Sequence, residues 1–181
     1  MKDPVIFSNF LSKDDFKTLQ DYVVGLDKTS TNFSEQFNMY EFGGSDILNL
    51  LHTKLTDFAR DFFENPSIVP SFNFGSWYFG DASLEKHRDV NACQYSIDMC
   101  VYQKEPWDLY IEGKPYTLME NEAVLYYGEE QRHWREKFPN PEYNVVCNVF
   151  FFFVDSEHWF LKEPSENHDK IRRQNAILRN Y

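Results

Sequence analysis

Three residues of this sequence have the types and the spacing to hold one metal ion. His87 and Asp89 stand two positions apart, and in an extended strand the side chains of residues i and i+2 point to the same side. His133 follows much later in the chain, which leaves room for strands that cross a sheet and return. Two histidines and one carboxylate on one side of an ion leave its other positions open, an arrangement that suits a redox-active iron(II) centre.

Two amphipathic helices are predicted ahead of these residues. Ser12 offers an N-cap for the first helix and Gly25 a stop, because a serine hydroxyl accepts from the free N–H groups of a first turn and glycine tolerates the conformation that ends a helix. Ser45 offers the N-cap of the second helix, whose apolar residues recur at helical spacing until Asn65-Pro66. His52 falls within this helix, on an edge that is expected to be polar.

From Val69 onward the pattern changes to strands. Apolar and aromatic residues gather in short runs bounded by turn residues. The predicted strands cover residues 72–79, 95–102, 107–111, 116–119, 123–127, 133–137 and 144–155. Because no helix separates these strands, βαβ units are excluded and the sheets should be mainly antiparallel, as in a barrel, sandwich or jelly roll.

The whole chain, residues 1–181, is expected to form a single domain. Hydrophobic residues make up 42% of it and aromatic residues alone 18%, which excludes a disordered protein. We expect a helical N-terminal support over residues 1–68, the β core over residues 69–155, and a polar tail over residues 156–181 with a short helix near residues 169–178.

Charge and cysteine usage exclude several classes of protein. The net charge of −11 argues against a nucleic-acid partner, which needs a basic face. The N-terminus has no long apolar run, and the most apolar stretch, residues 145–154, is interrupted by Asn148 and is too short to cross a bilayer. Three cysteines with no CxxC pair predict buried core thiols and an intracellular, cytoplasmic setting.

The order of motifs around the candidate ligands resembles that of the 2-oxoglutarate- and iron-dependent dioxygenases, in particular the compact prolyl-hydroxylase-like members of bacteria and viruses. The motifs are Y-F-G at 78–80, H-R-D at 87–89, Y-S at 95–96, Y-Y-G-E-E at 126–130 and H-W-R-E at 133–136. The resemblance covers about residues 70–155 and implies a double-stranded β-helix, the jelly-roll fold of cupins. It implies Fe(II) held by His87, Asp89 and His133, with 2-oxoglutarate and O2 as cosubstrates.

The resemblance also implies a reaction. A C–H bond would be hydroxylated while 2-oxoglutarate is converted to succinate and CO2, and peptidyl proline is a substrate of this branch. Related halogenases lack the ligand that corresponds to Asp89, so its presence favours hydroxylation. A free amino acid or another small molecule is an alternative substrate. The pocket mouth is expected to lie at residues 78–86 and Trp107, whose exposed aromatic rings would suit a proline or an extended peptide.

The sequence departs from the family's pattern at the anchor for 2-oxoglutarate. Many relatives carry a basic residue about ten positions after the second histidine, but residues 144–155 contain neither Lys nor Arg. Arg135 is the predicted replacement, because it follows His133 by two positions and shares its direction in a regular strand. Tyr78 and Tyr95 are predicted to donate hydrogen bonds to the carboxylates of 2-oxoglutarate.

Other roles for these residues and for the chain stay open. Arg135 could form a surface ion pair with Glu136 or another nearby acid, and the two tyrosines could serve only in packing. The chain could be another cupin-type metal enzyme, although such enzymes usually present more histidines near the metal. It could also be a non-catalytic β-helix interaction module, which the missing downstream basic residue favours. The sequence does not indicate an oligomeric state.

Overall fold

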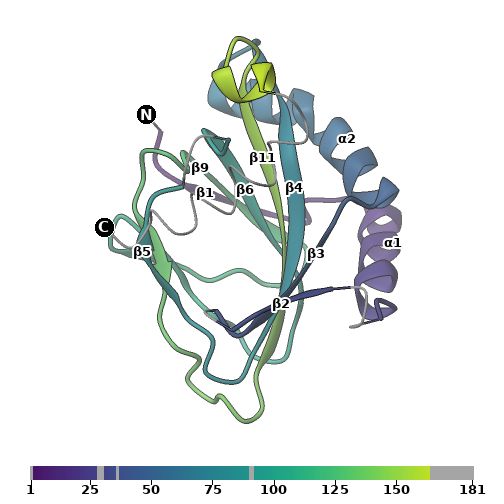
Figure 1. Ribbon diagram of the computed structural model, residues 1–181, viewed down its shortest axis with the longest axis vertical. Coiled ribbons are helices and arrows are strands. Elements are labelled where there is room, and N and C mark those ends of the chain that lie inside the picture. Colours follow the sequence, from purple (N-terminus) through teal and green to yellow (C-terminus); the bar gives the residue numbers. More distant parts are fainter. Residues whose placement is uncertain (1, 28–30, 36, 90–91, 164–181) are drawn as a thin grey trace.

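Two antiparallel sheets form the body of the molecule (Figure 1). The computed structural model describes residues 2–27, 31–35, 37–89 and 92–163, so the short helix expected near residues 169–178 lies outside the described part. The larger sheet has the order β1 (Val5–Ser8), β9 (Glu122–Tyr126), β6 (Tyr95–Gln103), β11 (Val145–Asp155), β4 (Ile68–Phe79), β3 (Met39–Gly43) and β2 (Asn32–Ser34). The smaller sheet has the order β5 (Leu84–His87), β10 (His133–Arg135), β7 (Leu109–Ile111) and β8 (Lys114–Tyr116). The predicted mainly antiparallel jelly-roll fold is confirmed.

Helices α1 (Lys13–Val24) and α2 (Asp46–Phe63) cover the outer face of the larger sheet (Figure 1). Both predicted caps are confirmed, since Ser12 Oγ accepts from the N–H of residue 15 at 3.1 Å and Ser45 Oγ from that of residue 48 at 3.3 Å. The second helix ends at Glu64, which has a φ of 55°, just before the predicted stop. Neither described helix combines the length and the apolarity that crossing a bilayer requires.

The region expected to form a helical N-terminal support, residues 1–68, also supplies β1, β2 and β3. Strand β1 pairs with β9, and β3 pairs with β4. These strands have three to five residues, too few alternations for a period of two to be recognised. Strand β2 pairs with its neighbour β3, but the partners of β1 and β3 in the rest of the sheet lie far away in the sequence, so local patterns could not reveal those pairings.

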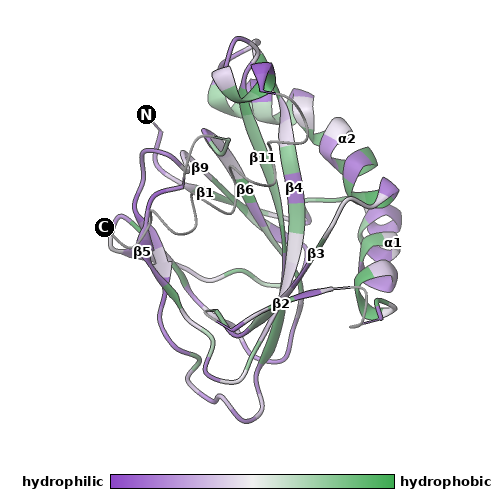
Figure 2. Ribbon diagram, viewed as in Figure 1, coloured by the Kyte–Doolittle hydropathy of each residue, from purple (hydrophilic) through white to green (hydrophobic). Residues whose placement is uncertain are grey.

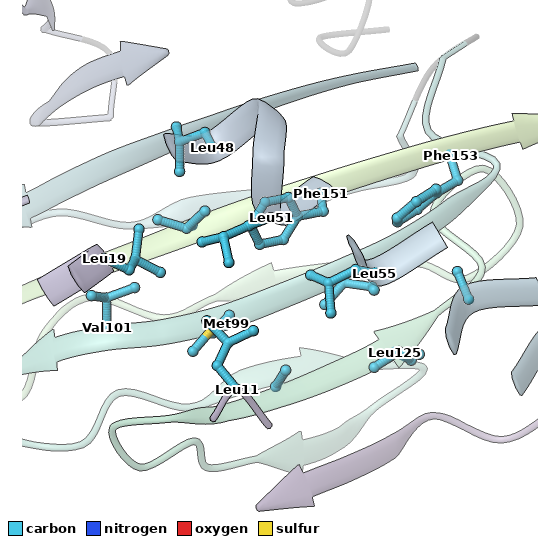
Figure 3. Close-up of a cluster of buried hydrophobic side chains, with 14 of the residues drawn as sticks. Leu11, Leu19, Leu48, Leu51, Leu55, Met99, Val101, Leu125, Phe151 and Phe153 are labelled. Carbon is cyan, nitrogen blue, oxygen red and sulfur yellow. The ribbon is translucent and has the colours of Figure 1, made fainter. Parts of the chain in front are cut away.

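Strand β11 divides its side chains between two layers of the core. One set, which includes Phe151 and Phe153, packs with Leu48, Leu51 and other residues of the helices (Figure 3). The other set points between the two sheets and comprises Val146, Asn148, Phe150 and Phe152. Figure 2 shows β11 as apolar along most of its length. All three cysteines are buried and free, as predicted.

The expectation that His52 lies on a polar edge was wrong, because its side chain is buried against β11. Its Nε2 donates to the carbonyl of Phe152 at 2.8 Å, and its Nδ1 accepts from Asn73 Nδ2 at 3.2 Å. The ring also contacts Phe153 at a centroid distance of 4.6 Å. Burial therefore lowers the pKa of His52 to about 4, and the neutral ring satisfies both of its nitrogens.

This buried histidine predicts a loss of stability in mild acid. Between pH 6.5 and about 4 the unfolded chain binds a proton at position 52 that the folded chain excludes, so stability falls as the pH falls. We expect the free energy of unfolding to drop by about 2 kcal/mol from this residue between pH 7 and pH 5. Urea denaturation at both pH values would measure it, with His52→Gln as the non-titrating control. An equal drop in both proteins would contradict the assignment.

Candidate metal centre

The pairing of β5 with β10 places two histidines opposite each other. His133 is the register partner of His87, the last residue of β5, and Asp89 lies two positions after it. Asp89 Oδ1 lies 3.5 Å from the Nε2 atom of each histidine, and the three ligand atoms lie within 4.8 Å of one another. Ligands about 2.1 Å from a shared ion and at about 90–110° to each other lie roughly 3.0–3.4 Å apart. The three predicted ligands therefore fit one ion.

Backbone carbonyls fix the tautomer of both histidines. His87 Nδ1 lies 2.7 Å from the carbonyl oxygen of Glu85, and His133 Nδ1 lies 3.0 Å from that of Gln131. A carbonyl only accepts, so each Nδ1 carries the proton and donates it. Both Nε2 lone pairs then point toward Asp89, which is the form that a metal requires.

The carboxylate of Asp89 is held by groups that sequence reasoning missed. Its backbone N–H donates to the carbonyl of Gly128 at 2.8 Å, and its Oδ2 accepts from Ser96 Oγ at 3.4 Å. Oδ1 is thereby turned toward the two histidines. Gly128 leaves no space here, because a Cβ at this position would lie 2.5 Å from the carbonyl oxygen of Cys93 and 2.6 Å from Asp89 Oδ2.

A second acid, Glu129, lies close enough to Asp89 for the two charges to interact. Burial, followed by the negative charge of Asp89, raises the pKa of Glu129 to about 7. Its Oε1 is buried and has no hydrogen-bond partner among the described residues. A divalent cation beside Asp89 would offset the repulsion between the two acids.

Arg135 faces the interior of the molecule, as the strand pattern predicted, and does not form the alternative surface pair with Glu136. Its Nη2 donates to Asp98 Oδ2 at 2.8 Å, and its Nη1 donates to the carbonyl oxygen of Trp107 at 2.6 Å. Its guanidinium also lies 4.9 Å from the centroid of the Trp107 ring. Contact between Arg135 and a cosubstrate stays a prediction.

Asp98 is a buried acid between this arginine and the metal ligands. It lies on β6, is 1% exposed, and accepts a further hydrogen bond from Asn148 Nδ2 at 3.0 Å. Burial raises the pKa of Asp98, while Arg135 acts in the opposite direction through its charge and its hydrogen bond. The arginine predicted to anchor 2-oxoglutarate is therefore already paired with an acid of the chain itself.

The two predicted tyrosines lie on opposite faces of the larger sheet. Tyr78 is buried between the sheets, where burial raises its pKa, and it packs against Trp107 at a centroid distance of 5.2 Å. Tyr95 instead packs against the helix-side core, and its hydroxyl donates to Asp155 Oδ1 at 3.1 Å. Since neighbouring residues of a strand face opposite ways and Ser96 faces Asp89, the structure does not bring Tyr95 to the triad.

Trp107 was expected to present an exposed ring at the pocket mouth, and this was wrong. Its side chain is buried, packs against Phe138 at a centroid distance of 4.2 Å, and donates from Nε1 to the carbonyl of Glu136 at 2.7 Å. The ring therefore belongs to the buried packing around the guanidinium of Arg135. A tryptophan beside a proline in sequence gives no local sign of which side it takes.

A signal for some of the missed residues was present in the sequence. Ser96, Asp98 and Asn148 interrupt strands that are otherwise apolar, and buried polar groups require partners. Their positions on the inward face of β6 and β11 point to a polar interior. Gly128 gave no such signal, because its role depends on the distance between segments that are remote in the sequence.

Comparisons with known proteins give the fold an independent basis. No protein-family model and no curated protein matches the sequence. Among solved structures, the chain resembles HygX from Streptomyces hygroscopicus with nickel and 2-oxoglutarate bound (TM-score 0.67, 10% identity, 85% of this chain and 83% of that chain). It also resembles a Pseudomonas putida prolyl-4-hydroxylase (0.66, 12%, 84% and 92%) and an oxidoreductase of the 2OG-Fe(II) oxygenase family from Burkholderia pseudomallei (0.63, 12%, 86% and 85%). The chain therefore has the double-stranded β-helix fold of 2-oxoglutarate- and iron(II)-dependent oxygenases.

Proposed function

We propose that the protein is an Fe(II)- and 2-oxoglutarate-dependent oxygenase that hydroxylates a C–H bond of its substrate. The observation that carries this proposal is the triad itself. His87 and His133 direct their Nε2 lone pairs, and Asp89 its Oδ1, at one point between β5 and β10, inside a fold that other oxygenases of this kind share. Three ligands on one side of an ion leave room for a chelating cosubstrate and O2.

Each part of the site has a task in this proposal. His87, Asp89 and His133 hold the ion, the carbonyls of Glu85 and Gln131 orient the two rings, and burial of all three ligand side chains limits access of water. Iron(II) bound there would supply, with 2-oxoglutarate and O2, the oxidation of a C–H bond and the release of succinate and CO2. The protein supplies binding, orientation and shielding.

We propose a prolyl peptide as the substrate class, with a small molecule as the alternative. The likeness to a prolyl-4-hydroxylase supports the former. The likeness to HygX, whose structure was also solved with hygromycin B bound, supports the latter. Incubation with prolyl peptides and mass spectrometry would test the choice, since hydroxylation adds one oxygen atom. Succinate formation without any modified peptide would favour the small molecule.

An anaerobic titration would test the proposed chemistry. Iron(II) and then 2-oxoglutarate are added to the protein, and a weak visible charge-transfer band is expected when the 2-oxo acid chelates the metal. His133→Ala, which removes one ligand, should lose the band. Arg132→Ala, which changes an exposed neighbour, should keep it.

The same titration separates the other functional classes. Metal binding without a band would favour another cupin-type metal enzyme. No metal binding by either the wild type or His133→Ala would favour a non-catalytic interaction module. Either result would overturn the proposed oxygenase function.

A further inference from the structure

A cluster of four polar residues lies between the two sheets beside the metal ligands. Ser76 on β4, Asp98 on β6, Arg135 on β10 and Asn148 on β11 are each at most 3% exposed. We call these four residues the interior polar cluster. It includes the arginine that is predicted to receive the tail of a 2-oxo acid, so the charges and hydrogen-bonding groups of the other members decide which tail fits.

The charge of Arg135 is already balanced. Asp98 accepts from its Nη2 at 2.8 Å, and both side chains are buried, so solvent screens this pair little. The neighbouring phenols Tyr78 and Tyr126 are neutral, because burial raises the pKa of each. A second carboxylate brought to this arginine would lie near Asp98 in a medium of low dielectric constant, where like charges repel strongly.

The interior polar cluster contains a buried acceptor, Asn148 Oδ1, that lacks a hydrogen-bond donor within the described residues. Asn148 Nδ2 donates to Asp98 Oδ1, which fixes the orientation of the amide and leaves its Oδ1 buried without a partner among the described residues. Ser76 is directly opposite Asn148 in the pairing of β4 with β11, and its buried hydroxyl neighbours the phenol of Tyr78. A carboxylate tail offers only acceptors, whereas an amide or hydroxyl tail can donate to Asn148 Oδ1.

Arg135 retains donors for the other half of such a tail. The hydrogen bonds to Asp98 and to the carbonyl of Trp107 occupy one N–H each of Nη2 and Nη1, and a guanidinium carries five. A neutral amide could therefore accept from Arg135 through its oxygen and donate to Asn148 through its nitrogen. Such an amide would pair with the free N–H groups of Arg135 and with the oxygen of Asn148, and it would bring no second buried negative charge.

We propose that Asp98 is a specificity-determining residue that makes the cosubstrate pocket bind 2-oxo acids with a neutral, hydrogen-bonding tail more tightly than those with a carboxylate tail. The inference rests on the proposed function, since it assumes a 2-oxo acid chelated to iron(II) at the triad. Under this proposal 2-oxoglutarate still binds, but its distal carboxylate competes with Asp98 for Arg135.

The test compares two ligands that differ only in the tail. N-oxalylglycine is a stable isostere of 2-oxoglutarate, and N-oxalylglycinamide has the same chelating end with an amide tail. Anaerobic calorimetry on the iron(II)-loaded full chain measures both dissociation constants. We expect the amide to bind about 10-fold more tightly to the wild type, because like-charge contact is costly and unpaired acceptors are satisfied.

In Asp98→Asn the competing charge is absent. The ratio of the two dissociation constants should therefore shift by at least about 10-fold in favour of the carboxylate ligand, so that the wild-type preference is reversed. Glu136→Gln, which neutralises an exposed acid next to Arg135, should keep the wild-type ratio. The wild-type comparison stands even if Asp98→Asn fails to fold. A wild-type preference for the carboxylate, or an unchanged ratio in folded Asp98→Asn, would overturn the inference and leave the oxygenase function intact. Binding of neither ligand would overturn both.

Discussion

Gly128→Ala is expected to weaken iron(II) binding by about 100-fold, although no metal ligand is changed. The added Cβ would lie 2.6 Å from Asp89 Oδ2 and 2.5 Å from the carbonyl oxygen of Cys93, and it would also meet Ser96 Oγ. None of these atoms belongs to the far end of a long, flexible side chain. The carboxylate must therefore turn away from the point shared by the two histidines, and its hydrogen bond from Ser96 is lost.

Calorimetric titration with iron(II) under anaerobic conditions would measure this effect, with circular dichroism to verify folding. Gly43→Ala is a matched control. Its Cβ would meet nothing closer than 3.4 Å, and residue 43 lies on β3, which carries none of the metal ligands. Its iron affinity should equal that of the wild type. If Gly128→Ala binds iron as tightly as Gly43→Ala does, Asp89 does not reach the ion from the position described.

Arg135→Met is expected to lower the free energy of unfolding by about 3–5 kcal/mol at pH 8, because it leaves Asp98 buried with no cation. Of the side-chain hydrogen bonds that Asp98 accepts within the described residues, the one from Asn148 would remain. Methionine retains much of the volume and the apolar contact with Trp107, so cavity formation contributes little to this loss. Urea denaturation would give the value.

The pH dependence separates the lost charge from lost packing. Burial already raises the pKa of Asp98, and Arg135 opposes that rise, so removing the arginine raises the pKa further. A carboxyl whose folded pKa lies above its unfolded pKa loses stability as the pH rises between the two values. Arg135→Met should therefore be destabilised less at pH 5 than at pH 8.

A double variant completes the argument. Asp98→Leu in the Arg135→Met background should recover most of the lost stability, because neither charge then remains buried. Equal losses at both pH values, or no recovery in the double variant, would contradict a buried ion pair. Arg135→Met should still bind iron, since none of the three metal ligands is altered.

Two of the metal ligands, His87 and Asp89, were predictable because their geometry is local. The two-residue spacing of His87 and Asp89 sets their shared direction, and one more histidine at a strand start completes the set. The helix caps Ser12 and Ser45 were predictable for the same reason, since a cap acts within its own first turn. The two-residue spacing and the caps need no knowledge of which strands become neighbours, whereas His133 was assigned from the order of motifs and meets His87 through the pairing of β5 with β10.

The partners of Arg135 and Tyr95 were not predictable in this way. Arg135 pairs with Asp98 across the space between two sheets, and that contact depends on the register of three strands. Tyr95 is separated from the triad by one position of register, since the adjacent Ser96 is the residue that reaches Asp89. A shift of one residue reverses every side chain of a strand, and the sequence pattern leaves such shifts undetermined.

The direct opposition of His87 and His133 across β5 and β10 also has a mechanical consequence. Strand β5 is at the edge of the smaller sheet, with four residues and β10 as its neighbour there. An ion bound by both histidines would cross-link that edge strand to β10. A shift in the register of the two strands would remove one of the ligands from the ion. Metal at about 100 times its dissociation constant would add roughly 2.7 kcal/mol to the folded state. Amide hydrogen exchange along β5 should therefore be slower with metal bound than without it. The ion would then stabilise the edge of the smaller sheet in addition to serving as the reaction centre.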